Sequence, residues 1–167
     1  MAVAPNVPEG GRDAEAGSIR VGLVGSSGGH LAQLLALRPV WERWDRFWVT
    51  FPTPDAESLL EGERVYWCYH PTNRNVPNLL RNTVLAADVL RRERPTHLLS
   101  TGAAVAVPFF YLGRLTGAQT IYIEVIDRVA APTLTARIVR PVTRHLLVQW
   151  PEQLRLYRNA QLLGPLL

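Results

Sequence analysis

Short apolar runs alternate with segments of helical periodicity over most of this chain, and that alternation constrains the fold more than any other feature. The runs are apolar throughout rather than at every second residue, which is typical of strands buried on both faces of a parallel sheet. The sequence therefore predicts an α/β domain with a Rossmann-like parallel sheet of about six strands and helices on both faces. The expected strands are residues 19–25, 46–51, 64–68, 97–100, 120–124 and 145–148, with a shorter candidate at 160–163.

The clearest helical pattern covers residues 79–94, where apolar residues recur about every three to four positions until Pro95 ends the pattern. Shorter helices are expected at residues 31–37, 55–60 and 133–140. A further apolar helix follows Thr101-Gly102 and ends near residues 116–117. Pro108 lies inside that segment and predicts either a kink or a later start of the helix.

The first 18 residues differ from the rest of the chain, because they are rich in Ala, Pro, Gly and acids and lack apolar periodicity. We expect residues 1–18 to form a disordered tail and residues 19–167 to form a single domain. The tail lacks the pattern of a signal peptide, and no run of about 18 apolar residues predicts a membrane span. Cys68 is the only cysteine, which excludes an internal disulfide and favours the cytoplasm.

The net charge of +4 is unevenly distributed, and every basic side chain apart from histidine is arginine. Residues 1–63 carry five arginines against nine acids, whereas residues 128–167 carry six arginines against one acid. A basic C-terminal third suits a phosphate-bearing ligand or an anionic membrane surface, and it equally suits a solvated basic face. Nucleic acid is not an expected partner, because no basic run is interleaved with aromatic residues.

The turn after the first strand, Gly25-Ser26-Ser27-Gly28-Gly29-His30, precedes a predicted helix. Glycines there let the backbone approach a ligand, and the free N–H groups at the helix start favour a phosphate or diphosphate. The turn is not a Walker loop, because no Gly-Lys-Ser/Thr follows it. No acid ends the second strand, so we predict neither a dinucleotide nor any other cofactor. No cluster of acids and histidines has the spacing of a metal site.

Two residues at predicted strand ends are candidate catalytic groups. His30, at the start of the first helix, could act as a general base or bond a substrate hydroxyl, or it could simply bond the backbone. Glu124 closes the apolar run TIYIE, where a carboxylate is costly unless it faces the cleft or is paired. It could act as the base or bind a sugar hydroxyl, and the alternative is an ion pair with Arg128 or Arg137.

Other polar residues could contact a ligand at the same sheet edge. Thr101-Gly102 supplies a second helix start there, and two such starts could hold a diphosphate between them. The loop at residues 70–75 contains Asn73, Arg74 and Asn75, which could close over a sugar or phosphate or remain a solvated loop. Arg128 would add positive charge near the phosphates.

Three tryptophans at positions 41, 44 and 48 form a cluster in the sequence. Exposed, they would suit a membrane interface, but a partly buried packing cluster is favoured.

Residues 100–150 resemble the bacterial polysaccharide-biosynthesis proteins of the PssD, CpsF and EpsE type. The motifs GSSGGH, PTNRN, NLLRN and VQW also fit that family. These proteins are related to the eukaryotic anchoring subunit of the dolichol-linked N-acetylglucosaminyltransferase. A more distant resemblance is to the N-terminal half of MurG, with Gly25–His30, Thr101–Ala103 and Ile123–Ile126 at its corresponding turns. Of the His-Glu-Gln-Asn that ends the MurG strand, this chain keeps only Glu124.

The resemblance implies the acceptor-side half of a GT-B glycosyltransferase, a hexosyltransferase subunit active with a separate donor-binding subunit. It implies transfer from a nucleotide sugar to a lipid-diphosphate-linked saccharide in exopolysaccharide or capsule synthesis. Contact with the inner face of the cytoplasmic membrane would then be peripheral. Two alternatives remain open, a non-catalytic anchor or activator of the donor-binding partner and an independent nucleotide-binding enzyme.

Overall fold

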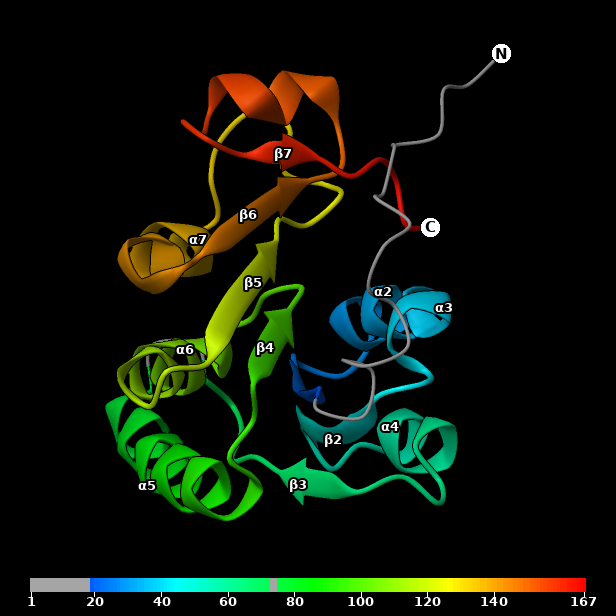
Figure 1. Cartoon of the computed structure of the whole chain (residues 1–167), viewed down its shortest axis with the longest axis vertical. Coiled ribbons are helices and arrows are strands. Elements are labelled where there is room, and N and C mark those ends of the chain that lie inside the picture. The colour runs from blue at the N-terminus through cyan, green and yellow to red at the C-terminus, as the bar shows by residue number, and fades with distance from the viewer. Residues whose placement is uncertain (1–18, 73–74) are drawn as a thin grey trace.

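The computed structural model describes residues 19–72 and 75–167, which form a sheet with helices on both faces (Figure 1). All of the strand–strand pairings are parallel, so the chain crosses back over the sheet between one strand and the next. The elements, in chain order, are β1 (Arg20–Val24), α2 (Gly29–Ala36), α3 (Arg38–Trp41), β2 (Asp45–Thr50), α4 (Pro54–Leu59), β3 (Val65–Trp67), α5 (Val76–Glu93), β4 (His97–Ser100), α6 (Ala106–Leu115), β5 (Gln119–Ile123), α7 (Leu134–Val139), the 3-10 helix η1 (Arg140–Val142), β6 (His145–Val148), the 3-10 helix η2 (Pro151–Arg155) and β7 (Gln161–Leu162).

The strands form a seven-stranded sheet in the order β3-β2-β1-β4-β5-β6-β7. The predicted parallel α/β sheet is therefore confirmed, and the shorter candidate strand near the end of the chain is its seventh member. The chain order reverses between β1 and β4, which are direct neighbours in the sheet. In open parallel sheets a ligand site lies outside the carboxyl ends of the strands at such a switch point.

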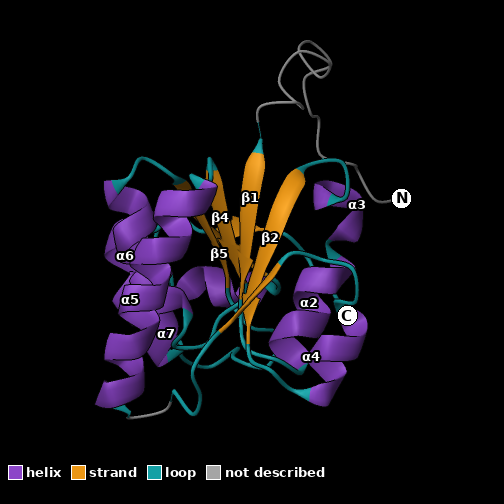
Figure 2. Ribbon diagram, turned by 90° about the horizontal axis from the view of Figure 1, so that it is seen from below, coloured by secondary structure: helices purple, strands orange, loops and turns teal. Residues whose placement is uncertain are grey.

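Two groups of helices cover the two faces of the sheet (Figure 2). Helices α2, α3 and α4 bury Leu31, Trp41 and Ala56, respectively, in a core with β1 and β2. Helices α5, α6 and α7 bury the other core, which includes Phe109 and Phe110 of α6. Helices on both faces explain why the strands are apolar on both sides.

Two glycines allow unusually close packing around Leu98 of the central strand β4. A Cβ on Gly22 of β1 would lie 2.6 Å from Cζ of Phe47 and 2.8 Å from Cδ2 of Leu98. A Cβ on Gly113 of α6 would lie 2.2 Å from Cδ1 of the same leucine. Helix α6 therefore packs directly on the sheet beside the switch point. This close packing fixes the position of the loop that precedes α6.

Helix α5 agrees with its sequence pattern but begins earlier, at Val76, because Asn75 caps it. The Asn75 side chain accepts a hydrogen bond from the Asn78 N–H at 3.0 Å. The helix ends at Glu93, followed by Arg94 in the left-handed region (φ 45°) and then by Pro95.

Helix α6 begins at Ala106, not at Thr101-Gly102, so the predicted second helix start at that turn is wrong. Gly102 and Ala103 both have positive φ angles, 127° and 71°, and such residues cannot continue into a helix. Pro108 then falls in the first turn of the helix, where a proline is tolerated. The later start that Pro108 predicted is confirmed.

The tryptophan cluster packs inside the protein. Trp41 and Trp48 are buried, and their rings meet edge to face with centroids 5.3 Å apart. Trp44 is half-buried against the same core. The interpretation of this cluster as a membrane interface is therefore wrong, and the packing interpretation is confirmed.

Candidate functional site

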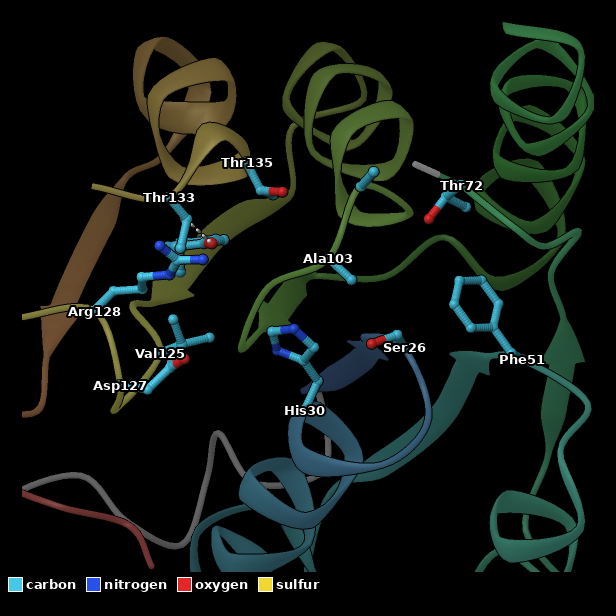
Figure 3. Close-up of a pocket in the computed structure, with 12 residues that line it drawn as sticks. Ser26, His30, Phe51, Thr72, Ala103, Val125, Asp127, Arg128, Thr133 and Thr135 are labelled. Atoms are coloured by element: carbon cyan, nitrogen blue, oxygen red, sulfur yellow. Dashed lines mark hydrogen bonds between the residues drawn. The ribbon is translucent and has the colours of Figure 1, made fainter. Parts of the chain in front are cut away.

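A polar pocket of about 390 Å³ lies at the carboxyl ends of the strands around the switch point (Figure 3). Of the predicted site residues, Ser26, His30 and Arg128 line it. The other lining residues are Phe51, Thr72, Ala103, Ala104, Tyr122, Val125, Asp127, Thr133 and Thr135. Thr72 belongs to the loop at residues 70–75, for which closure over a ligand was one interpretation, and Phe51 directly follows β2, but neither was named as a site residue.

The imidazole of His30 extends from the start of α2 into this pocket (Figure 3). Its Nδ1 lies 2.9 Å from the carbonyl oxygen of Thr101. Because a carbonyl can only accept, Nδ1 carries the proton in the neutral ring, and Nε2 keeps a lone pair. Burial is the largest influence on His30 and lowers its pKa below the ordinary value, opposed by the Thr101 carbonyl and by the charges of Asp127 and Glu124. The ring is therefore neutral near pH 7 and able to accept a proton.

Thr101 and Gly102 contact this imidazole and fix its position. The Thr101 hydroxyl donates to the His30 carbonyl oxygen at 2.8 Å, so the two residues are joined in both directions. The Gly102 N–H donates to the Ser100 hydroxyl oxygen at 3.0 Å. A Cβ on Gly102 would lie 2.7 Å from Cε1 of the ring, so only glycine fits. Both polar groups of this turn are engaged within the protein rather than directed at a ligand.

The first turn presents backbone at the edge of the pocket. Gly28 is the N-cap of α2 with a φ of 72°, and no side chain caps this helix. Gly28 and Gly29 are exposed, with open space where a side chain would be, whereas Ser26 lines the pocket and Ser27 does not. Unsatisfied N–H groups at a helix start favour a negative charge.

An acidic side chain lies near the same turn, at the start of α4. The pKa of Asp55 is lowered, chiefly by the Thr53 hydroxyl and in smaller part by backbone N–H groups that include Gly28.

Glu124 follows β5 and is fully buried, at 0% exposure. One carboxylate oxygen accepts from the N–H of the next residue and from the Thr133 hydroxyl, both at 3.0 Å. The other accepts from the Thr133 N–H at 3.2 Å and from the Tyr157 hydroxyl. Among the described residues it forms no ion pair, so the pairing with Arg128 or Arg137 is wrong: neutral donors satisfy the carboxylate instead.

Tyr157 is a reliable donor to that carboxylate. Burial, followed by the hydrogen bond and the charge of Glu124, raises the pKa of Tyr157, so its hydroxyl keeps the proton. The carboxylate thus closes the loop at residues 125–132 by joining its two ends.

The same loop is supported from behind by the segment at residues 149–153. Side-chain N–H groups of Gln149, Trp150 and Gln153 donate to the backbone carbonyls of residues 124, 125, 126 and 128, at 2.8–3.1 Å. Gln149 also donates to the side chain of Gln33 in α2 at 2.6 Å. Because so many of its carbonyls are bonded, the loop holds Asp127 and Arg128 at the pocket wall.

The remaining sequence candidates lie elsewhere. Asn73 and Arg74 lie outside the described residues. Asn75 caps α5 and lines a neighbouring groove rather than this pocket. Within residues 19–72 and 75–167, no three His, Cys, Asp or Glu side chains gather as metal ligands would.

Residues 69–166, more than half of the chain, match the family of oligosaccharide biosynthesis proteins described as Alg14 like. The chain belongs to the Alg14-like family. Alg14 is the membrane-anchoring subunit of a GlcNAc transferase, and Alg14-like proteins pair with a separate catalytic Alg13-like subunit. A comparison with curated proteins finds no match.

Solved structures of similar fold include larger enzymes. MurG of Acinetobacter baumannii superposes with a TM-score of 0.71 at 18% identity, covering 87% of this chain and 45% of MurG. The UDP-N-acetylglucosamine 2-epimerase of Rickettsia bellii gives a TM-score of 0.69 at 12% identity, covering 89% of this chain and 45% of the epimerase. A glycosyltransferase of Rickettsia africae gives 0.65 at 11% identity, covering 87% and 42% of the two chains.

This Alg14-like chain therefore spans less than half the length of the enzymes it superposes on, and it matches the fold of the N-terminal half of MurG. At such identities the likeness concerns the fold alone. Alg14-like proteins are membrane-associated. In the described parts of this chain, no helix is both long and apolar enough to cross a bilayer.

Proposed function

We propose that this Alg14-like chain is the acceptor-binding subunit of a two-component glycosyltransferase, working with a separate donor-binding subunit. The reaction is transfer of a sugar from a nucleotide sugar to a lipid-diphosphate-linked saccharide, in exopolysaccharide or capsule synthesis. The observation that carries the proposal is the neutral, anchored His30 in a pocket at the switch point of the sheet. The resemblance to the PssD, CpsF and EpsE proteins supports the choice of substrates, and it also supports a peripheral location at the inner face of the membrane.

In this proposal His30 is the general base. A hydroxyl of the acceptor saccharide donates its proton to Nε2 as its oxygen bonds to the anomeric carbon of the donor sugar. The bond from that carbon to the nucleoside diphosphate breaks, and the leaving group keeps the electron pair. A base of lowered pKa is unprotonated at neutral pH and so is ready to accept the proton. Glu124 has every acceptor position engaged, so its role is to fix the loop beside the pocket rather than to accept that proton.

Positive charge for the diphosphate comes from two places. Arg128 is exposed at the pocket wall and forms no ion pair with another described residue. The start of α2 is the second: the N–H of Gly29 can contact a phosphate there, whereas the Gly28 N–H faces the carboxylate of Asp55. Thr101 and Gly102 contribute by seating His30.

A second candidate function is a non-catalytic anchor that activates its partner. It is favoured by the pairing of Alg14-like proteins with a separate catalytic subunit. In that case the partner supplies the base, and His30 only links the turns after β1 and β4.

The test is transfer from a nucleotide sugar to a synthetic lipid-diphosphate saccharide by the chain co-purified with its donor-binding subunit. We expect His30→Ala to lower kcat by roughly 100-fold or more, as for loss of a general base. We expect Arg128→Ala to raise the KM for the acceptor by roughly 10-fold, as for loss of a charged hydrogen bond.

The matched controls are His145→Ala, at the opposite end of the sheet, and Arg158→Ala. Both residues are exposed and line neither the pocket nor the neighbouring groove. A His30→Ala complex with a kcat like that of the His145→Ala complex would refute the catalytic role and leave the anchoring function.

A further inference from the structure

An apolar groove of about 650 Å³ lies beside the polar pocket, between the start of α5 and the helices α6 and α7. Its size is within the roughly 300–1,000 Å³ of small-molecule sites. The three helices lie side by side on one face of the sheet (Figures 1 and 2). The apolar lining consists of Val76, Leu79, Val107, Leu134 and Ile138.

These side chains are far more exposed than the side chains of the two cores. Leu134 is 72% exposed, Val76 63% and Leu79 41%. Each apolar side chain left in water forgoes about 1.5–3 kcal/mol of burial energy. An apolar cluster of this kind marks a surface that is covered in the working state.

The groove and the polar pocket share part of their walls. Thr72, Ala104 and Thr135 line both cavities. Figure 3 shows Thr72 and Thr135 on the side of the pocket toward α5 and α7, with His30 and Ser26 on the other side. A ligand that fits the whole cleft must therefore be polar at the His30 end and apolar at the other.

We propose that this groove holds the first part of the hydrocarbon chain of the acceptor's lipid carrier, next to its diphosphate. The inference rests on the proposed function. It gives a binding site to the lipid part of the acceptor, which the polar pocket cannot hold. With the saccharide hydroxyl at His30, the diphosphate that joins saccharide to lipid lies at the shared rim. There the hydroxyls of Thr72 and Thr135 can donate to it, and Arg128 also lines the pocket. The subunit then recognises its acceptor by both parts, the saccharide diphosphate and the lipid.

The experiment compares two acceptors with the same saccharide diphosphate, one carrying only a methyl group on the diphosphate and one carrying a long polyprenyl chain. The variant is the double substitution Leu79→Gln, Leu134→Gln, assayed in the complex with the donor-binding subunit. Its matched control is Leu59→Gln, Leu115→Gln, which also changes two exposed helical leucines, here 55% and 82% exposed, outside the groove.

We expect the groove variant to raise the KM for the long-chain acceptor by roughly 10-fold or more, with kcat retained. The KM for the methyl-capped acceptor should change by less than about 2-fold, and the control variant should match the wild type on both. Equal changes on the two acceptors, or a groove variant that behaves like the control, would overturn the inference.

A second measurement separates lipid-chain binding from contact with the bilayer itself. Co-sedimentation with anionic liposomes that contain no acceptor should be the same for the groove variant and the wild type. Loss of that binding in the groove variant would show that the groove faces the bilayer, and the inference would be wrong. A wild-type complex inactive on both acceptors would instead refute the proposed function, and this inference with it.

Discussion

Replacing Glu124 tests whether a buried carboxylate serves structure or chemistry. In Glu124→Ala, four donors lose their acceptor: the N–H groups of Val125 and Thr133 and the hydroxyls of Thr133 and Tyr157. An unsatisfied buried donor costs about 1–3 kcal/mol. Partial entry of water and rotation of the hydroxyls reduce the sum, and relief of the buried charge reduces it further. We expect a loss of roughly 3–6 kcal/mol in the free energy of unfolding, a large part of the ~5–15 kcal/mol that a domain has.

Glu124→Gln separates size from charge. The glutamine amide keeps the shape of the side chain and one accepting oxygen, but its NH2 group faces other donors. Of these donors, only a hydroxyl can rotate so that its oxygen accepts a hydrogen bond from the NH2 group. We expect a smaller loss of about 1–2 kcal/mol, as for one mismatched buried hydrogen bond. Turnover should fall with the acceptor KM raised, because the loop that carries Arg128 is loosened.

The measurement is urea unfolding followed by tryptophan fluorescence, with Glu152→Ala as the control for an exposed acid in the same region. The reasoning would be refuted if Glu124→Ala unfolded at the same urea concentration as the control. If Glu124→Gln kept full stability and lost about 100-fold in kcat, the carboxylate would be the base after all.

Three further predictions concern the imidazole and the central packing. Since burial lowers the pKa of His30, protonation inactivates the base only below pH 6.5. A plot of kcat/KM against pH should therefore rise and level off with a midpoint below pH 6.5. A midpoint above pH 6.5 would contradict the assignment of His30 as the base. Gly102→Ala places a Cβ 2.7 Å from the imidazole at a φ of 127°, so it should lower kcat by roughly 10-fold or more while the circular dichroism stays unchanged. Gly22→Ala overpacks Phe47 and should cost about 1–3 kcal/mol in urea unfolding, and an unchanged midpoint would show that the strand can shift.

The sheet could be predicted from the sequence because buried parallel strands leave a purely local signal. Apolar runs such as His97–Ser100 and His145–Val148 coincide with β4 and β6. The turn containing Ser26 and His30 follows from the same reasoning, since a parallel sheet brings its ligands to the strand ends. Pro108 indicated the later start of α6, but the positive φ of Ala103 could not be predicted, because an alanine side chain carries no signal for that conformation.

Contacts between distant segments could not be inferred from local patterns. The acceptor of Nδ1 of His30 is the carbonyl of Thr101, a backbone group that carries no residue-type signal. The donors to Glu124 include Tyr157, which lies in the segment after η2 and was not singled out. An ion pair with an arginine was one of the two interpretations of Glu124, and it is wrong because three neutral residues satisfy the carboxylate. Local periodicity predicts which elements form, whereas the partners of polar side chains depend on how the elements pack.

The position of β1 inside the sheet, between β2 and β4, has a consequence for how the protein folds during synthesis. Its neighbours are β2, synthesised soon after it, and β4, whose residues follow about the length of a small domain later. While a nascent chain has emerged only as far as β3, one edge of β1 presents unpaired N–H and C=O groups to the surroundings. Parallel pairing over such separations is slow, and an exposed apolar edge favours aggregation. Protection of that edge during synthesis, by the ribosome surface or a chaperone, should therefore decide how much of the chain reaches its native state.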